Sequence, residues 1–159
     1  MDVSEIFAKL KSHILEGLVF HDEMVRYYGF IHCDNFKREH EERYWDESEG
    51  YRKLCDYYMN HYNSLIPTEP MERPDVIPDS WYRYTRQEVD SQTRNTAIRV
   101  GAEKWVKWEK QTKNLYQQMW SELTGIGEIA AACFLECYIR DVDCELKHAE
   151  KSHMEVETK

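Results

Sequence analysis

Apolar and aromatic side chains recur every three or four positions along most of the chain, which is the spacing of one face of an α-helix. Asp2 can cap a first helix, and the pattern after it predicts helix over residues 3–33. Asp34 can cap a second helix, for which the same pattern continues over residues 36–65. Because the connection between them is very short, we expect the two helices to form an antiparallel hairpin.

The pattern changes in residues 66–80, which hold all four prolines of the chain. Proline disfavours helix in the residue before it, so this segment is expected to be an extended connector. Fifteen extended residues at about 3.1 Å each reach roughly 45 Å, and a helix of about 28 residues is roughly 42 Å long. The connector is therefore long enough to cross the whole length of the hairpin.

The second half of the chain repeats the helical pattern. Thr85 has a capping-box partner three residues later, and helix is predicted over residues 86–123. This segment is longer than its neighbours, so we expect a kink or break near Gly101 or an overhanging first part. A fourth helix is predicted over residues 127–151.

These elements predict one all-α domain over residues 1–152, followed by a polar tail over residues 153–159. With only six glycines and four prolines in 159 residues, the chain lacks the turns that a β-sandwich or barrel requires. Two antiparallel hairpins joined by a long crossover resemble the ferritin-like superfamily of four-helix bundles. A simple up-down-up-down bundle is the alternative topology.

Net charge and cysteine content limit the classes of partner and the cellular compartment that the sequence favours. The formal net charge is -9, which disfavours nucleic acid and anionic membrane surfaces as partners. The longest apolar run, residues 129–135, is far too short for a membrane span, and no signal-peptide pattern begins the sequence. The odd number of cysteines, five, favours reduced thiols in a cytoplasmic protein. Small acidic bundles rich in Tyr and Trp resemble bacterial or prophage proteins of unassigned role.

The ferritin-like resemblance implies a di-iron site, in which two helices each supply a Glu and two supply a Glu-x-x-His pair. In this chain Glu-x-x-His occurs at Glu145-His148 and Glu150-His153, both on the fourth predicted helix. The second predicted helix has no such pair. The complete di-iron pattern is therefore absent, and no cofactor is expected from a motif.

A divergent site is possible at the middle of the first hairpin. His21 lies thirteen residues before Asp34 and Glu47 thirteen residues after it, so the two side chains should face each other at one level. They can be ligands of one divalent metal such as iron or manganese, or a buried His and Glu pair that satisfy each other without metal, which is the commoner arrangement. Further candidate ligands on the other predicted helices and nearby are Glu16, Glu109, Asp141, Glu145 and His148.

The fourth predicted helix carries Cys133, Cys137, Cys144 and His148 on what the periodicity indicates is its inward face. Thiolate and imidazole ligands suit zinc, but Cys133 and His148 would lie about 22 Å apart along one helix axis. The row is therefore interpreted as core packing.

Two segments suggest contact with other proteins. The acidic run Glu39–Glu49 is either a solvated helix face or a docking surface for a partner. Trp81, Tyr82 and Tyr84 either hold the connector on the bundle or form an interface with a second subunit. With no catalytic motif, the sequence favours a non-enzymatic, self-associating bundle, and a ferritin-like metal-binding protein is the alternative.

Overall fold

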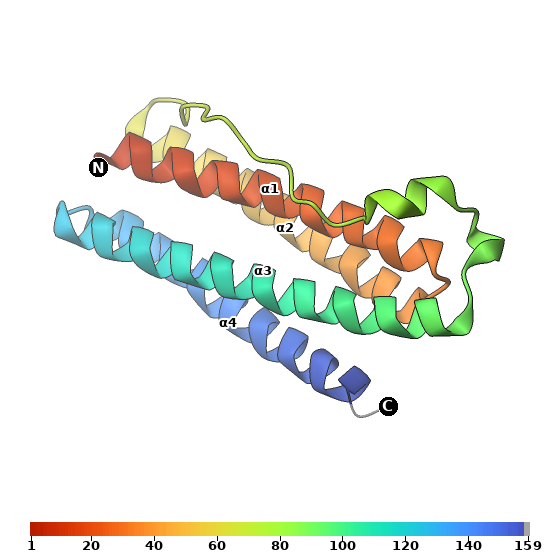
Figure 1. The fold of residues 1–159 in the computed structure, drawn as a ribbon. Helices are drawn as coiled ribbons and strands as arrows, with labels where there is room; N and C mark the ends of the chain where they lie inside the picture. Colours follow the sequence, from red (N-terminus) through yellow and green to blue (C-terminus); the bar gives the residue numbers. More distant parts are fainter. Residues whose placement is uncertain (158–159) are drawn as a thin grey trace.

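The computed structural model describes residues 1–157, and these residues form four long helices without any β-strand (Figure 1). The helices are α1 (Val3–Phe30), α2 (Asp34–Tyr62), α3 (Ser91–Gly125) and α4 (Ile129–Glu157), and two 3₁₀ turns, η1 (Asp79–Arg83) and η2 (Arg86–Glu88), precede α3. The predicted all-α four-helix bundle is confirmed.

The helices pair as two antiparallel hairpins, α1 with α2 and α3 with α4, and α1 also packs against α3 (Figure 1). Between the hairpins, the segment after α2 runs back along α1 to the opposite end of the bundle. As a result α2 and α3 point in the same direction. This arrangement requires a long crossover, so the simple up-down-up-down alternative is wrong.

The crossover is held on α1 by contacts that advance together along both segments. In order along α1, Lys11 contacts Ile66, Glu16 contacts Glu72, and Glu23 contacts Arg73. Tyr27 and Phe30 then both contact Trp81. The ring of Trp81 stacks on both Tyr27 and Phe30, at centroid distances of 4.7 and 5.2 Å. Trp81 therefore anchors the end of the crossover, while Tyr82 and Tyr84 are exposed.

The start of α3 differs from the prediction. The capping box of Thr85 and Glu88 forms, but it closes only the single turn η2. Helix α3 begins at Ser91, where the Asp90 side chain accepts a hydrogen bond of 2.7 Å from the Thr93 backbone N–H. The capping box was therefore predicted at the right residues, but α3 starts at a second N-cap, Asp90, five residues later.

Helix α3 continues through Gly101 without the expected break. A Cβ atom at Gly101 would lie 2.4 Å from the hydroxyl oxygen of Tyr28 and 2.8 Å from a ring carbon of Tyr27. The glycine is therefore needed for the close approach of α1 and α3, and it does not interrupt the helix.

The other helix ends shift by a few residues. Helix α1 ends at Phe30, where His32 adopts a left-handed conformation with φ of 57°. Helix α4 extends to Glu157, so residues 153–157 of the predicted tail are helical, and the last two residues lie outside the described part of the chain.

The apolar core is divided into two clusters by a buried polar layer. One cluster contains Ile6, Leu10, Leu54, Leu123 and Leu135, and the other contains Met24, Tyr28, Ile31, Trp105 and Ala149. Where the two clusters meet lie the fully buried polar side chains of His21, His40 and Glu109. Buried polar groups destabilise the folded state unless they have partners, so this layer is the candidate functional site.

The predicted inward row on α4 is wrong. Cys133, Cys137 and Cys144 are exposed, and the His148 side chain is 58% exposed. The buried face of α4 consists instead of Ala131, Ala132, Leu135, Val142, Leu146, Ala149 and Ser152. Burying the larger aliphatic side chains Leu135, Val142 and Leu146 stabilises the orientation in which this face is turned inward. No helix within residues 1–157 combines the length and the apolar run that a bilayer span requires.

Candidate metal centre

All four helices contribute ionisable side chains to the polar layer: His21 from α1, His40 and Glu47 from α2, Glu109 from α3 and Glu145 from α4. The Nε2 atom of His21 lies 3.7 Å from an Oε1 atom of Glu47 and 3.7 Å from Oε1 of Glu109. One ligand atom from each of these three residues lies within 4.8 Å of the other two. The expected convergence of His21 and Glu47 is confirmed, and Glu109 joins them.

Gly17 provides the space for the Glu47 carboxyl group. It lies one helical turn before His21 on the same face of α1, and a Cβ atom there would be 3.1 Å from Oε2 of Glu47. The Trp108 ring closes the same space, 3.5 Å from that Cβ position. A larger residue would displace the carboxyl group, so the glycine is part of the site.

The centre is shielded from water. The side chains of His21 and Glu109 are fully buried, and that of Glu47 is 12% exposed. Burial, assisted by the charge of Arg43, lowers the pKa of His21 to about 3. The imidazole is therefore uncharged at neutral pH and offers a lone pair or an N–H group to its neighbours.

Burial has the opposite effect on the carboxyl groups. It raises the pKa of Glu47 to about 8, and the nearby Glu145 adds to the shift. Burial and the proximity of Glu145 and Glu47 raise the pKa of Glu109 well above its usual range. Burial also raises the pKa of Glu145, against the effect of Arg43. The three clustered carboxyl groups thus bind protons more readily than free ones, and a divalent cation would compete with these protons.

Four buried atoms in and beside the centre lack a hydrogen-bond partner. They are Nε2 of His21, Oε2 of Glu109, Nε2 of His40 and Nε of Arg43. The other carboxyl oxygen of Glu109 accepts a hydrogen bond of 3.2 Å from the indole Nε1 of Trp105, one turn earlier on α3. Trp105 therefore fixes the orientation of Glu109, whose carboxyl group also lies close to that of Glu145.

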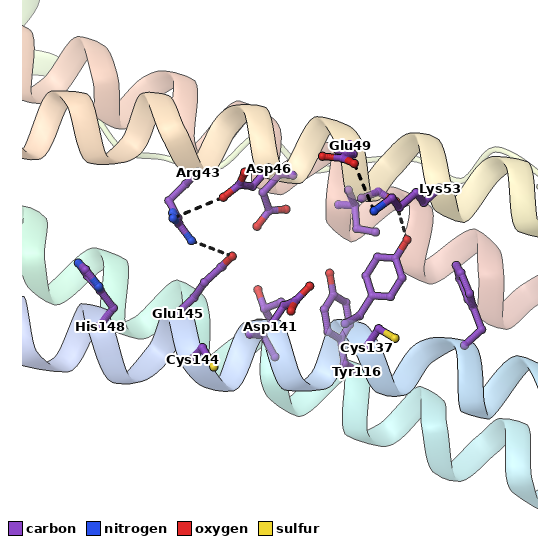
Figure 2. A pocket seen from close by; sticks show the side chains of 17 residues that line it. Arg43, Asp46, Glu49, Lys53, Tyr116, Cys137, Asp141, Cys144, Glu145 and His148 are labelled. Carbon is purple, nitrogen blue, oxygen red and sulfur yellow. Dashed lines mark hydrogen bonds and ion pairs between the residues drawn. The ribbon is translucent and has the colours of Figure 1, made fainter.

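Arg43 lies beside the centre, one turn before Glu47 on α2. Its guanidinium group donates a hydrogen bond of 3.2 Å to Glu145 and forms an ion pair at 3.4 Å with Asp46 (Figure 2). Through the first contact it holds the α4 carboxyl group against α2. Neither Arg43 nor Trp105 was predicted from the sequence to belong to the site, although both occur four residues from a candidate Glu on the same helix.

A cleft of about 570 Å³ between α2 and α4 opens onto the centre. Figure 2 shows Arg43 and Asp46 extending into it from α2, and Asp141 and Glu145 from α4. Glu47 and Glu145 belong both to the lining of the cleft and to the buried centre. A small ion can therefore reach the carboxyl groups from solvent through a cleft whose lining includes five acidic residues.

Three other candidate ligands lie outside the convergent set. Glu16 accepts a hydrogen bond of 3.1 Å from the backbone N–H of Glu72 and so helps to hold the crossover. Asp141 lines the cleft but is exposed. His148 forms an ion pair with Glu39 across α2 and α4, so only the Glu of the Glu145-His148 pair reaches the centre.

The acidic run Glu39–Glu49 is not a uniform surface. His40 within it is fully buried, and Glu47 belongs to the centre, whereas Trp45 is 69% exposed. The run therefore has one face directed into the polar layer and one directed to solvent.

Comparison with known proteins adds no family to this picture. No family model, curated protein or solved structure matches the chain. The geometry of the centre is therefore the basis on which a function can be assigned.

Proposed function

We propose that this protein is a ferritin-like metal-binding bundle, in which His21, Glu47 and Glu109, with Glu145 beside them, hold a divalent cation. The observation that carries the proposal is the unpartnered Nε2 atom of the fully buried His21, which faces carboxyl oxygens from two other helices at 3.7 Å. The layout of two hairpins and a long crossover supports the ferritin-like assignment.

The competing interpretation is a buried His and Glu pair that satisfy each other. Such a pair needs a nitrogen-to-oxygen distance of about 2.7–3.2 Å, and 3.7 Å is too long. Buried polar atoms are rarely left without partners, yet Nε2 of His21 and Oε2 of Glu109, on different helices, both lack one here. A cation is one partner that would satisfy both.

The spacing of the donor atoms also suits a metal ion. Two ligands that are each about 2.1 Å from one ion lie between about 3 and 4 Å apart, depending on the coordination angle. The 3.7 Å separations around His21 are within this range. Binding would therefore need only small side-chain movements.

The chemistry of the donors selects the class of metal. One imidazole nitrogen with several carboxylate oxygens suits iron(II), manganese(II) or zinc. Calcium and magnesium prefer ligand sets made of oxygen alone. Soft metals bound by thiolates are disfavoured, because no cysteine belongs to the cluster of ligand atoms.

The proposal is tested by measuring metal content and stability. Protein purified without chelator should contain iron, manganese or zinc, and metal added to chelator-treated protein should raise its melting temperature. An ion at a hundred times its dissociation constant stabilises the folded state by about 2.7 kcal/mol. Because the ion replaces carboxyl protons, its affinity should increase with pH up to about 8.

Two variants make the test specific. Glu109→Gln removes a fully buried ligand and should abolish the metal-induced rise in melting temperature. Glu42→Gln removes an exposed carboxylate from α2 and should leave that rise unchanged. Metal content far below one ion per chain, with no effect of added metal on melting, would contradict the proposal.

Self-association is a second proposal, and exposed aromatic side chains support it. Tyr82 and Tyr84 are 72% and 54% exposed, and Trp45 is exposed within the acidic run. A location in the reducing cytoplasm is proposed as well, and three exposed free thiols are compatible with it. Light scattering that found only monomers at high concentration would contradict self-association.

A further inference from the structure

His40 on α2 is a fully buried histidine in contact with the centre but outside the ligand set. Its Nδ1 atom lies 3.0 Å from Nδ1 of His21, and the two rings are 5.2 Å apart at an interplanar angle of 32°. Two nitrogen atoms at this distance form a hydrogen bond only when one carries a proton and the other offers a lone pair. The direction of this bond fixes where His21 carries its own proton.

Two directions are possible for an uncharged pair. If His40 donates, the proton of His21 is at Nε2 and faces the carboxyl groups, so His21 cannot bind a metal. If His21 donates from Nδ1, its Nε2 atom has a free lone pair directed between Glu47 and Glu109. Only the second direction makes His21 a ligand.

The surroundings of His40 favour the second direction. Its Nε2 atom is buried and has neither a hydrogen-bond donor nor an acceptor within reach among the described residues. The rings of Trp105 and Phe20 stand at 63° and 78° to the His40 ring, at centroid distances of 4.9 and 6.3 Å, and Tyr28 stacks on it at 5.6 Å. An N–H group is attracted to the negative face of an aromatic ring, whereas a lone pair gains nothing there. The proton of His40 is therefore best placed at Nε2, which leaves its Nδ1 as the acceptor.

We infer that His40 is the positioning residue of the metal centre: its Nδ1 accepts a hydrogen bond from Nδ1–H of His21 and so directs the Nε2 lone pair of His21 at the ion. The inference rests on the proposed function. Metal-binding histidines generally donate their second N–H to an oxygen acceptor, and here an imidazole nitrogen takes that role. Ring orientation and proton position are then set before the metal arrives, and no proton has to move between the rings.

The proton positions can be read directly. Nitrogen-15 NMR of the histidine rings, with and without Zn²⁺, should show His21 protonated at Nδ1 and His40 at Nε2 in both states. The measurement on metal-free protein does not depend on metal binding. Protonation of His21 at Nε2 in the metal-free protein would overturn the inference.

Variants of His40 separate positioning from packing. Loss of an outer hydrogen-bond partner costs about 10–100-fold in metal affinity. His40→Phe keeps an aromatic ring without an acceptor and should weaken Zn²⁺ binding by that factor. His40→Gln offers an amide oxygen to His21 and should restore most of the affinity. Unchanged affinity in His40→Phe would overturn the inference, and should that variant fail to fold, the NMR result decides.

His13 supplies a matched control. It is another histidine of α1, hydrogen-bonded to Thr112 at 2.6 Å and stacked on Trp108, two helical turns from His21. His13→Gln should bind Zn²⁺ as tightly as the wild-type protein. If wild-type protein binds no Zn²⁺ while its NMR spectra show the expected proton positions, the proposed function fails, and only the direction of the hydrogen bond from His21 to His40 stands.

Discussion

Glu47→Gln should make the metal-free protein more stable at alkaline pH, although it removes a proposed ligand. Burial raises the pKa of Glu47 from 4.5 to about 8. In the unfolded chain the group loses its proton above about pH 4.5, whereas the folded protein retains it until about pH 8. The unfolded state therefore binds fewer protons in this window, and stability falls as the pH rises.

The size of the effect follows from the shift. One pKa unit corresponds to about 1.4 kcal/mol, so a displacement from 4.5 to about 8 is worth at most about 5 kcal/mol. Because the side chain is 12% exposed, some of this is lost to solvent screening. Between pH 5 and pH 8, the wild-type protein should lose about 2–4 kcal/mol relative to Glu47→Gln. The amide keeps the shape of the carboxyl group and carries no charge.

Urea unfolding followed by tryptophan fluorescence, in chelator at several pH values, measures this difference. Glu42→Gln, on the exposed side of α2, should follow the wild-type protein at every pH. The reasoning is refuted if the free energies of unfolding of wild type and Glu47→Gln change in parallel from pH 5 to pH 8. Glu109 and Glu145 contribute to both proteins, so only their difference reports on Glu47.

Two further predictions concern the scaffold. Gly101→Ala should destabilise the protein by about 1–3 kcal/mol from overpacking against buried tyrosines, more than the gain of up to about 1 kcal/mol from helix propensity. Gly125→Ala in the same helix meets no atom within 4 Å and should not destabilise it; equal urea midpoints for the two variants would contradict the packing argument. Trp81→Ala removes the stacking that anchors the crossover and should speed proteolysis within residues 66–80. Tyr82→Ala, at a 72% exposed position, should be cleaved at the wild-type rate.

The scaffold could be predicted from the sequence because its determinants are local. Helical spacing indicated the four helices, and the prolines of residues 66–80 indicated the crossover. The contact of His21 with Glu47 could also be predicted, because residues at equal distances in sequence from the turn of an antiparallel hairpin lie opposite each other. His21 and Glu47 are each thirteen residues from Asp34. Glu109 was identified as a candidate only through the general requirement for further carboxylates.

The predictions that were wrong concern how each helix is rotated about its own axis and which distant residues its side chains meet. On α4 the cysteines form one row of small apolar residues and the buried aliphatic residues form another. Helical periodicity alone does not tell which of the two rows faces the core. Glu16 and His148 do not reach the centre, because they bind residues of distant segments: Glu16 binds Glu72, and His148 binds Glu39. Such contacts depend on the crossover path and on α4 packing, and no local pattern encodes them.

The most direct test of the central claim is a crystal structure of the protein grown with Mn²⁺, with anomalous diffraction recorded. The account predicts an anomalous peak about 2.0–2.2 Å from Nε2 of His21, with oxygen atoms of Glu47 and Glu109 completing the coordination. No peak at this position, with His21 hydrogen-bonded directly to either carboxyl group, would contradict it.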